Sequence, residues 1–174
     1  MNFPIFTNNI TIFLLKNEEI SKNNMTIYLT SKPSSSTIEH FVRFMKDKGV
    51  TDIFCFCEPS YESYIFRTNN IYFHNLEIPD GCIPTNDMLK SFNSDINEII
   101  NKTDAPIISF YCHSGLGRAP TMLAYLMITK YKWNRYNAIQ HIRHLIHGSI
   151  NGDQLKWILE STSIYKSKHV CTLL

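Results

Sequence analysis

Long apolar runs are missing from the sequence: no segment approaches the roughly 18 consecutive apolar residues of a helix that spans a bilayer. An excess of one charge is missing too, because 17 lysines and arginines nearly balance 15 aspartates and glutamates without forming a basic stripe. The resulting net charge of +2 argues against nucleic acid as a partner. The start of the chain lacks the basic front end and the small-residue cleavage site of a signal peptide, so we expect none.

Cysteines are few, and their spacing is irregular. The chain has five: Cys55, Cys57, Cys82, Cys112 and Cys171. An odd number at irregular intervals does not describe the disulfide framework of a secreted domain, so we expect a reducing, cytosolic setting. Cys55 and Cys57 lack a second pair at zinc spacing and are expected on one face of a buried strand. His141, His144 and His147 lack a carboxylate at a ligating interval and are expected on an exposed helix face, so we predict neither a metal site nor a cofactor.

The remaining composition, 44% hydrophobic and 18% charged over 174 residues, is typical of one globular domain. Apolar runs of strand length occupy residues 11–15, 25–30, 52–57, 71–76 and 106–111. Helical spacing occupies residues 36–49, about 88–100, 119–131, 135–147 and 152–165, with Asn134 and Asn151 as caps of the last two. Strands that alternate with helices imply right-handed crossovers. We therefore predict an α/β domain with a mostly parallel central sheet and helices on both faces.

The segment YCHSGLGRAPT at residues 111–121 follows one of these buried strands and leads into a helix. Beyond the carboxyl end of such a strand, free backbone N–H groups and the helix dipole favour an anion, and the planar fork of Arg118 can bind two phosphate oxygens. The same positive field favours the thiolate of Cys112, which is the nucleophilic form. A buried cysteine beside an incidental glycine loop is the alternative, but the strand–loop–helix context favours a phosphate cradle. The residues of this cradle are His113, Ser114, Gly115, Leu116, Gly117 and Arg118.

A thiolate that displaces an alkoxide or phenolate from phosphorus needs a proton donor for the leaving group. Asp80, in LEIPDGCIP, lies on the loop after the strand at 71–76, at the sheet edge expected for the nucleophile. Asp87 and Asp95 fall within the next helix, and Asp104 lies at the wrong end of its strand. We therefore assign the role of general acid to Asp80, with Glu77 as the second choice. An ordinary turn aspartate is the alternative.

With these residues in place, the chain resembles the cysteine-dependent protein tyrosine phosphatases of the dual-specificity type, and within them the phosphatases of regenerating liver (PRL, type IVA). The resemblance rests on CHSGLGRAP at 112–120, CEPSYE at 57–62, PDG at 79–81, GSINGDQL at 148–155 and the terminal CTLL. It implies an N-terminal extension and first strand in residues 1–24, a phosphatase domain in residues 25–166, and a tail in residues 167–174.

The resemblance implies a phosphocysteine mechanism. Cys112 attacks, Arg118 binds the phosphoryl group, and Asp80 protonates the leaving group and later activates water. It also implies a reversible disulfide between Cys57 and Cys112, which would protect the thiolate from irreversible oxidation. A buried structural cysteine is the alternative for Cys57.

Three departures from the family pattern predict slow turnover. Tyr111 stands where a histidine usually precedes the nucleophile. Ala119 lacks the hydroxyl that assists breakdown of the phosphocysteine, a feature shared with PRL proteins. The usual aromatic residue at the start of the acid loop is replaced by the stretch around Leu76 and Glu77.

The chain ends in Cys-Thr-Leu-Leu, a C-a-a-X pattern whose last leucine favours a geranylgeranyl group on Cys171, with an ordinary tail as the alternative. Because PRL-type proteins are prenylated here, we expect a cytoplasmic protein bound peripherally to the cytosolic face of plasma or endosomal membranes. The expected substrate is a phosphotyrosine protein or a phosphoinositide. The family also implies a CBS-domain magnesium transporter as a partner in the same cleft, and a homotrimer. Docking gated by phosphorylation or oxidation of Cys112 is the alternative to catalysis.

Overall fold

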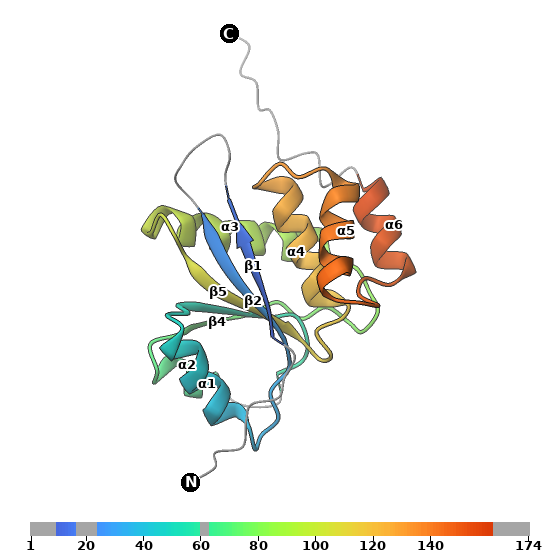
Figure 1. Ribbon diagram of the computed structural model, residues 1–174. Helices are drawn as coiled ribbons and strands as arrows, with labels where there is room; N and C mark the ends of the chain where they lie inside the picture. Colours follow the sequence, from blue (N-terminus) through green and yellow to red (C-terminus); the bar gives the residue numbers. More distant parts are fainter. Residues whose placement is uncertain (1–9, 17–23, 60–62, 162–174) are drawn as a thin grey trace.

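A mixed five-stranded sheet lies at the centre of the fold (Figure 1). The computed structural model describes residues 10–16, 24–59 and 63–161. In spatial order the strands are β1 (Thr11–Leu15), β2 (Met25–Ser31), β5 (Ile107–Cys112), β3 (Asp52–Cys55) and β4 (Tyr72–Asn75). The pairs β2–β5, β5–β3 and β3–β4 are parallel, whereas β1 runs antiparallel to β2. The predicted mostly parallel sheet is confirmed.

Helices cover both faces of the sheet, as predicted (Figure 1). One face carries α1 (Ile38–Asp47) and the short α2 (Tyr64–Arg67). The other face carries α3 (Asn86–Lys102), α4 (Arg118–Thr129), α5 (Arg135–Leu145) and α6 (Gly152–Glu160). The predicted caps are confirmed, since the side chains of Asn134 and Asn151 accept hydrogen bonds from backbone amides in the first turns of α5 and α6. Within the described ranges, no helix combines the length and the apolar character needed to cross a membrane.

Aromatic rings pack α3 and α4 against the middle of the sheet. Phe54 of β3 and Phe110 of β5 contact Phe92 of α3, with ring centroids 5.3 and 5.7 Å apart. Phe92 in turn contacts Tyr125 of α4 at 6.1 Å. All four side chains are buried, and edge-to-face pairs of this kind add roughly 1 kcal/mol each beyond the burial itself. These contacts therefore fix the position of α4 relative to the carboxyl ends of the strands.

Element boundaries differ from the predicted ones where loops leave the sheet. The strands predicted at 52–57 and 71–76 end at Cys55 and Asn75. Beyond these residues, isolated backbone hydrogen bonds replace the continuous ladder of the sheet. One such bond runs from the Ile78 amide to the Phe56 carbonyl (3.2 Å). The sequence does not predict α2, since four residues are too few to show helical periodicity. The last helix ends at Glu160, before the predicted end at 165, and residues 162–165 lie outside the described residues.

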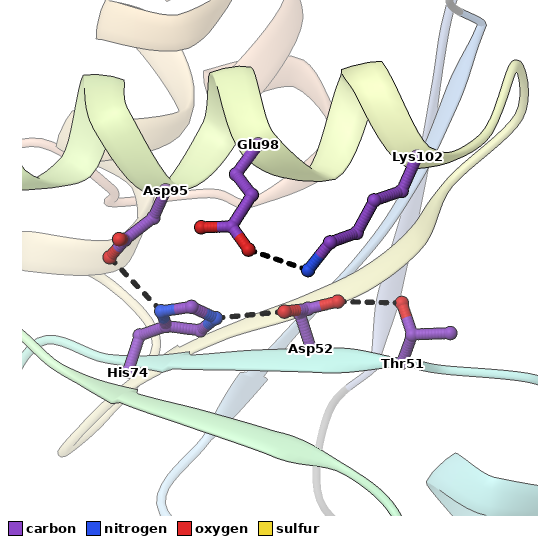
Figure 2. A network of polar contacts seen from close by, with 6 residues as sticks. All are labelled: Thr51, Asp52, His74, Asp95, Glu98 and Lys102. Carbon is purple, nitrogen blue, oxygen red and sulfur yellow. Dashed lines mark hydrogen bonds and ion pairs between the residues drawn. The ribbon is translucent and has the colours of Figure 1, made fainter.

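A histidine on the edge strand β4 ties α3 to the sheet (Figure 2). The Nε2 of His74 lies 2.8 Å from Oδ1 of Asp52 on β3, and its Nδ1 lies 3.0 Å from Oδ2 of Asp95 on α3. Phe54 stacks on the imidazole with ring centroids 4.3 Å apart, and the Thr51 hydroxyl donates to Asp52. Burial by itself lowers the pKa of His74. The hydrogen bond to Asp52 and the charges of both carboxylates outweigh burial and raise this pKa above its ordinary value of 6.5.

Replacing His74 with glutamine is expected to destabilise the fold in a pH-dependent way. The charged imidazole is favoured in the folded state, so its contribution is fully present below pH 6.5 and fades as the pH rises through the raised folded value. Urea unfolding should show His74→Gln less stable than wild type by about 2 kcal/mol near pH 6, and by less near pH 9. His144→Gln, at an exposed position, is the matched control. Equal losses at both pH values would contradict a charged His74.

Candidate active site

Cys112 is the last residue of β5, at the edge where the parallel strands of the sheet end. Its side chain is buried, and it pairs in register with Ser31 at the end of β2. Because α4 begins at Arg118, residues 112–118, here called the cradle loop, join a buried strand directly to a helix N-terminus. The predicted nucleophile therefore lies at the base of a loop that ends at the positive end of the α4 dipole.

The cradle loop turns several of its backbone N–H groups inward. Three of its carbonyls accept hydrogen bonds from groups outside the loop: His113 from the Lys32 amide (3.1 Å), Leu116 from the Ile150 amide (2.8 Å) and Gly117 from the Thr121 amide (3.0 Å). In a planar trans peptide the next N–H points opposite to the carbonyl. The amides of Ser114, Gly117 and Arg118 therefore face the space enclosed by the loop, as the binding of an anion requires.

The shape of the cradle loop requires a glycine at position 115 and leaves little room for a side chain at Gly117. Gly115 has a φ of +75°, and a Cβ there would lie 3.0 Å from the Thr30 carbonyl oxygen. A side chain at this position would be both strained and in collision with the backbone of β2. A Cβ on Gly117 would lie 3.3 Å from Nε2 of Gln154 on α6. The loop is thus packed tightly between β2 and α6.

The Arg118 guanidinium is 4% exposed and reaches three groups on neighbouring loops. One terminal nitrogen donates to the Ile78 carbonyl (3.0 Å), and the other lies 3.1 Å from Oδ1 of Asp80. Oε2 of Glu58 lies 3.7 Å from the first nitrogen. Because an arginine has five N–H donors in a fixed fork, it can hold these groups and still present N–H groups to a phosphate.

The structure brings Asp80 to the predicted cradle and places Asp87 and Asp95 elsewhere. Asp80 is 93% exposed, and its carboxylate is directed at the guanidinium of Arg118. Asp95 is bonded to a histidine, and Asp87 pairs with Lys90 at 2.8 Å. The sequence-based choice of Asp80 therefore agrees with the geometry. Its role as general acid stays a prediction.

Glu58 is a site residue that the sequence analysis does not identify. It follows the end of β3, at the same edge as the cradle loop. A hydrogen bond from its own backbone amide lowers the pKa of its carboxyl group, and the nearby charges of Lys32, Arg118 and His113 lower it further. Its position in the sequence could have identified it. Glu58 comes directly after Cys57, just beyond a buried strand that lies beside the strand with the nucleophile.

Cys57, two residues beyond the end of β3, is buried and its thiol is close to that of Cys55. Their shared hydrogen bond lowers the pKa of Cys55 to about 7, and it raises the pKa of Cys57 above its ordinary value. The charges of Lys32 and Arg118 act in the opposite direction and lower the pKa of Cys57, but their effect is smaller. Cys55, Cys57, Cys82 and Cys112 are free thiols, so the Cys57–Cys112 disulfide stays a prediction.

The two family departures next to the cradle loop are both buried. Tyr111 points to the α1 face of the sheet, where its ring meets Phe41 edge to face at 6.1 Å and its hydroxyl interacts with Cys55. It therefore packs in the core rather than reproducing the contacts of a histidine within the loop. Ala119 is fully buried in the first turn of α4 and supplies no hydroxyl beside the cradle.

The three histidines spaced three residues apart are exposed, as predicted. They are His141 and His144 within α5 and His147 just beyond its end. The ring of His141 contacts those of Phe13 and Trp133, with centroids 5.8 and 5.2 Å apart. Across the described residues, no group of three histidine, cysteine, aspartate or glutamate side chains gathers as a metal ion would require.

Known proteins with similar sequences or folds are named as phosphatases. No family model matches the chain. The PRL-1 phosphatase of Drosophila melanogaster is 28% identical over 153 residues, which cover 86% of this chain and 85% of that protein. The protein tyrosine phosphatase type IVA 3 of Bos taurus is 28% identical over 143 residues, or 80% of each chain. A solved structure described as a protein tyrosine phosphatase from Leishmania major has a TM-score of 0.78 at 24% identity, covering 87% of this chain and 98% of that one.

The structural likeness shows the fold, and the sequence similarity extends over both the strands and the helices that build the cradle. The cradle loop has a cysteine at its base and a buried arginine at its end. The chain is therefore similar in sequence to PRL (type IVA) protein tyrosine phosphatases, and it shares the fold of a solved protein tyrosine phosphatase.

Proposed function

We propose that the chain hydrolyses phosphate monoesters, with phosphotyrosine in proteins as the substrate, through a phosphocysteine intermediate. The observation that carries the proposal is the buried Arg118 guanidinium at the start of α4, beside a loop whose amides face inward and whose base is Cys112. An inward-facing set of N–H donors with one forked cation matches a phosphoryl group, which carries negative charge on three oxygens. The buried thiol supplies the nucleophile.

The reaction proceeds in two displacements. In the first, the Cys112 sulfur attacks phosphorus, the bond from phosphorus to the tyrosine oxygen breaks, and Asp80 gives its proton to that oxygen. In the second, water attacks the phosphocysteine, its proton passes to Asp80, and the sulfur–phosphorus bond breaks to release phosphate. Arg118 and the inward amides stabilise the charge on the phosphoryl oxygens in both steps.

The rim of the cradle favours a protein substrate over a phosphoinositide. The exposed side chains of the cradle loop are His113, Ser114 and Leu116, the last 43% exposed. Lys32, the nearby lysine, is bonded to the Glu58 carbonyl. A headgroup with several phosphates requires further cations, whereas a single aryl phosphate does not. Comparing turnover of phosphotyrosine peptides with that of phosphoinositide vesicles tests this choice.

Two regulatory features are part of the proposal. Peroxide would oxidise the thiols of Cys57 and Cys112 to a disulfide while the peroxide is reduced to water, and a thiol reductant would reverse this. Cys171, which lies outside the described residues, would carry a geranylgeranyl group and hold the protein at the cytosolic face of a membrane. A homotrimer on that membrane is an expectation from the family.

A second candidate function is partner binding through the same cleft, with a CBS-domain magnesium transporter as the partner. The buried Ala119 favours it, because no hydroxyl there assists the breakdown of the phosphocysteine. A long-lived phosphocysteine would then block docking until it is hydrolysed. Intact mass after brief exposure to an aryl phosphate distinguishes the two functions: a mass increase of one phosphoryl group that outlasts the substrate supports the docking role.

Substitution of the two central residues should remove activity by different routes. Cys112→Ser is expected to lower turnover of an aryl phosphate by roughly a thousandfold or more, because the serine is not ionised. Arg118→Lys is expected to lower kcat/KM by about a hundredfold, since an ammonium group cannot bind two oxygens in a fork. Steady-state kinetics on both variants test this, with Arg43→Lys at α1 as the matched control. Full activity of Cys112→Ser would rule out the proposed nucleophile.

Ala119→Ser is expected to speed the second step. A hydroxyl in the first turn of α4 would donate to the departing sulfur and stabilise the thiolate. Turnover should rise several-fold, roughly in proportion to the shorter lifetime of the phosphocysteine. Quenched-flow mass measurement of the intermediate, alongside steady-state kcat, provides the test. A higher kcat with an unchanged phosphocysteine lifetime would count against this account.

A further inference from the structure

The acid loop, residues 78–82, carries Asp80 and is held at both ends. At one end, Arg118 donates to the Ile78 carbonyl and lies 3.1 Å from Asp80. Within the loop, the Cys82 amide donates to the Pro79 carbonyl (3.0 Å), which closes a tight turn around the acid. The Asp80 side chain itself is 93% exposed, so its position depends mainly on where the backbone of the acid loop lies.

Two side chains at the start of α6 hold the other end of the acid loop. Nδ2 of Asn151 lies 3.0 Å from the Gly81 carbonyl oxygen, and Nε2 of Gln154 lies 3.2 Å from that of Cys82. The same side chains form the capping box of α6, because the oxygen of each accepts from the backbone amide of the other (2.9 and 3.1 Å). Each side-chain amide thus uses its oxygen for the helix and its NH₂ group for the acid loop.

Gln154 also lies against the cradle loop. It is fully buried, and the Cα of Gly117 is so close that an added Cβ would lie 3.3 Å from its Nε2. Cys82 and Ile83 are exposed and border a pocket of about 660 Å³ together with Trp157 of α6. Because these two side chains are exposed, the hydrogen bonds of the two NH₂ groups are what link the acid loop to α6.

We propose that Asn151 and Gln154 are positioning residues for the general acid: they keep the acid loop closed over the cradle, with Asp80 at Arg118, before any substrate binds. The inference rests on the proposed phosphatase function. Proton donation requires the acid within hydrogen-bond reach of the leaving oxygen, and small displacements of such a group cost large factors in rate. A loop closed in advance avoids the cost of ordering it in each turnover.

The test separates proton donation from phosphate binding by the choice of leaving group. Asn151→Ser keeps an oxygen for the α6 cap but loses the NH₂ donor to the Gly81 carbonyl. Gln154→Glu is the second variant, since glutamate also serves in a capping box but does not donate to the Cys82 carbonyl. For both, kcat/KM on phenyl phosphate, whose leaving group needs a proton, should fall roughly tenfold. On 2,4-dinitrophenyl phosphate, whose leaving group needs none, the change should stay within about twofold.

Two controls complete the design. Asn134→Ser makes the same change at the cap of α5, away from the acid loop, and should leave both substrates unaffected. Asp80→Asn should show the same substrate pattern with a larger loss, and adding Asn151→Ser to it should cause no further loss on phenyl phosphate. Further loss in that double variant, or the same pattern in Asn134→Ser, would overturn the inference.

The remaining outcomes separate the inference from the function on which it rests. If wild type hydrolyses both substrates and Asn151→Ser lowers both equally, or neither, the positioning role is wrong and the phosphatase function stands. If wild type turns over neither substrate, the proposed function itself fails. A selective loss on phenyl phosphate in both α6 variants supports the positioning role.

Discussion

A single buried guanidinium organises the carboxyl edge of the sheet. Arg118 is joined to the acid loop through the Ile78 carbonyl and Asp80, and Glu58 approaches it from the end of β3. Burying a guanidinium is costly unless its donors are satisfied. The loops around the cradle supply acceptors for it, from Ile78, Asp80 and Glu58. The arginine proposed to bind the phosphoryl group is therefore also the residue that links these loops.

The parallel strands make this convergence possible. Because β2, β5, β3 and β4 all end at one edge, the segments that follow them meet there without long excursions. Ser31 and Cys112 are the last residues of β2 and β5, and Glu58 and the acid loop follow β3 and β4. The aromatic contacts of Phe92 and the bond between His74 and Asp95 fix α3, so the chain between β4 and α3 has both of its ends on rigid elements.

The departures from the family pattern have a common structural consequence. Tyr111 directs its ring into the core under α1 and interacts with Cys55 instead of supporting the cradle loop. Ala119 removes a hydroxyl from the first turn of α4. The loop is nevertheless held firmly from outside, by β2 at Gly115 and by α6 at Gly117. Its geometry thus depends on packing against neighbouring elements more than on side chains of its own.

The sequence alone determined the chemistry that is local in the chain. The cysteine, the two glycines and the arginine of the cradle loop lie within seven residues, so their spacing between a strand and a helix already predicts a phosphate cradle. The caps Asn134 and Asn151 are also predictable from the sequence, because a helix cap depends on residues close together in the chain. Asp80 follows from the rule that parallel strands end at one edge, but only as one of several acids.

Only the tertiary structure decided which distant side chains meet at that edge. Glu58 beside Arg118, Gln154 between two loops, and Tyr111 on the α1 side leave no periodic or local pattern in the chain. Such contacts arise when the sheet and its helices pack and bring separate loops within hydrogen-bond distance. Because the partners come from different elements, spacing along the chain does not reveal these contacts.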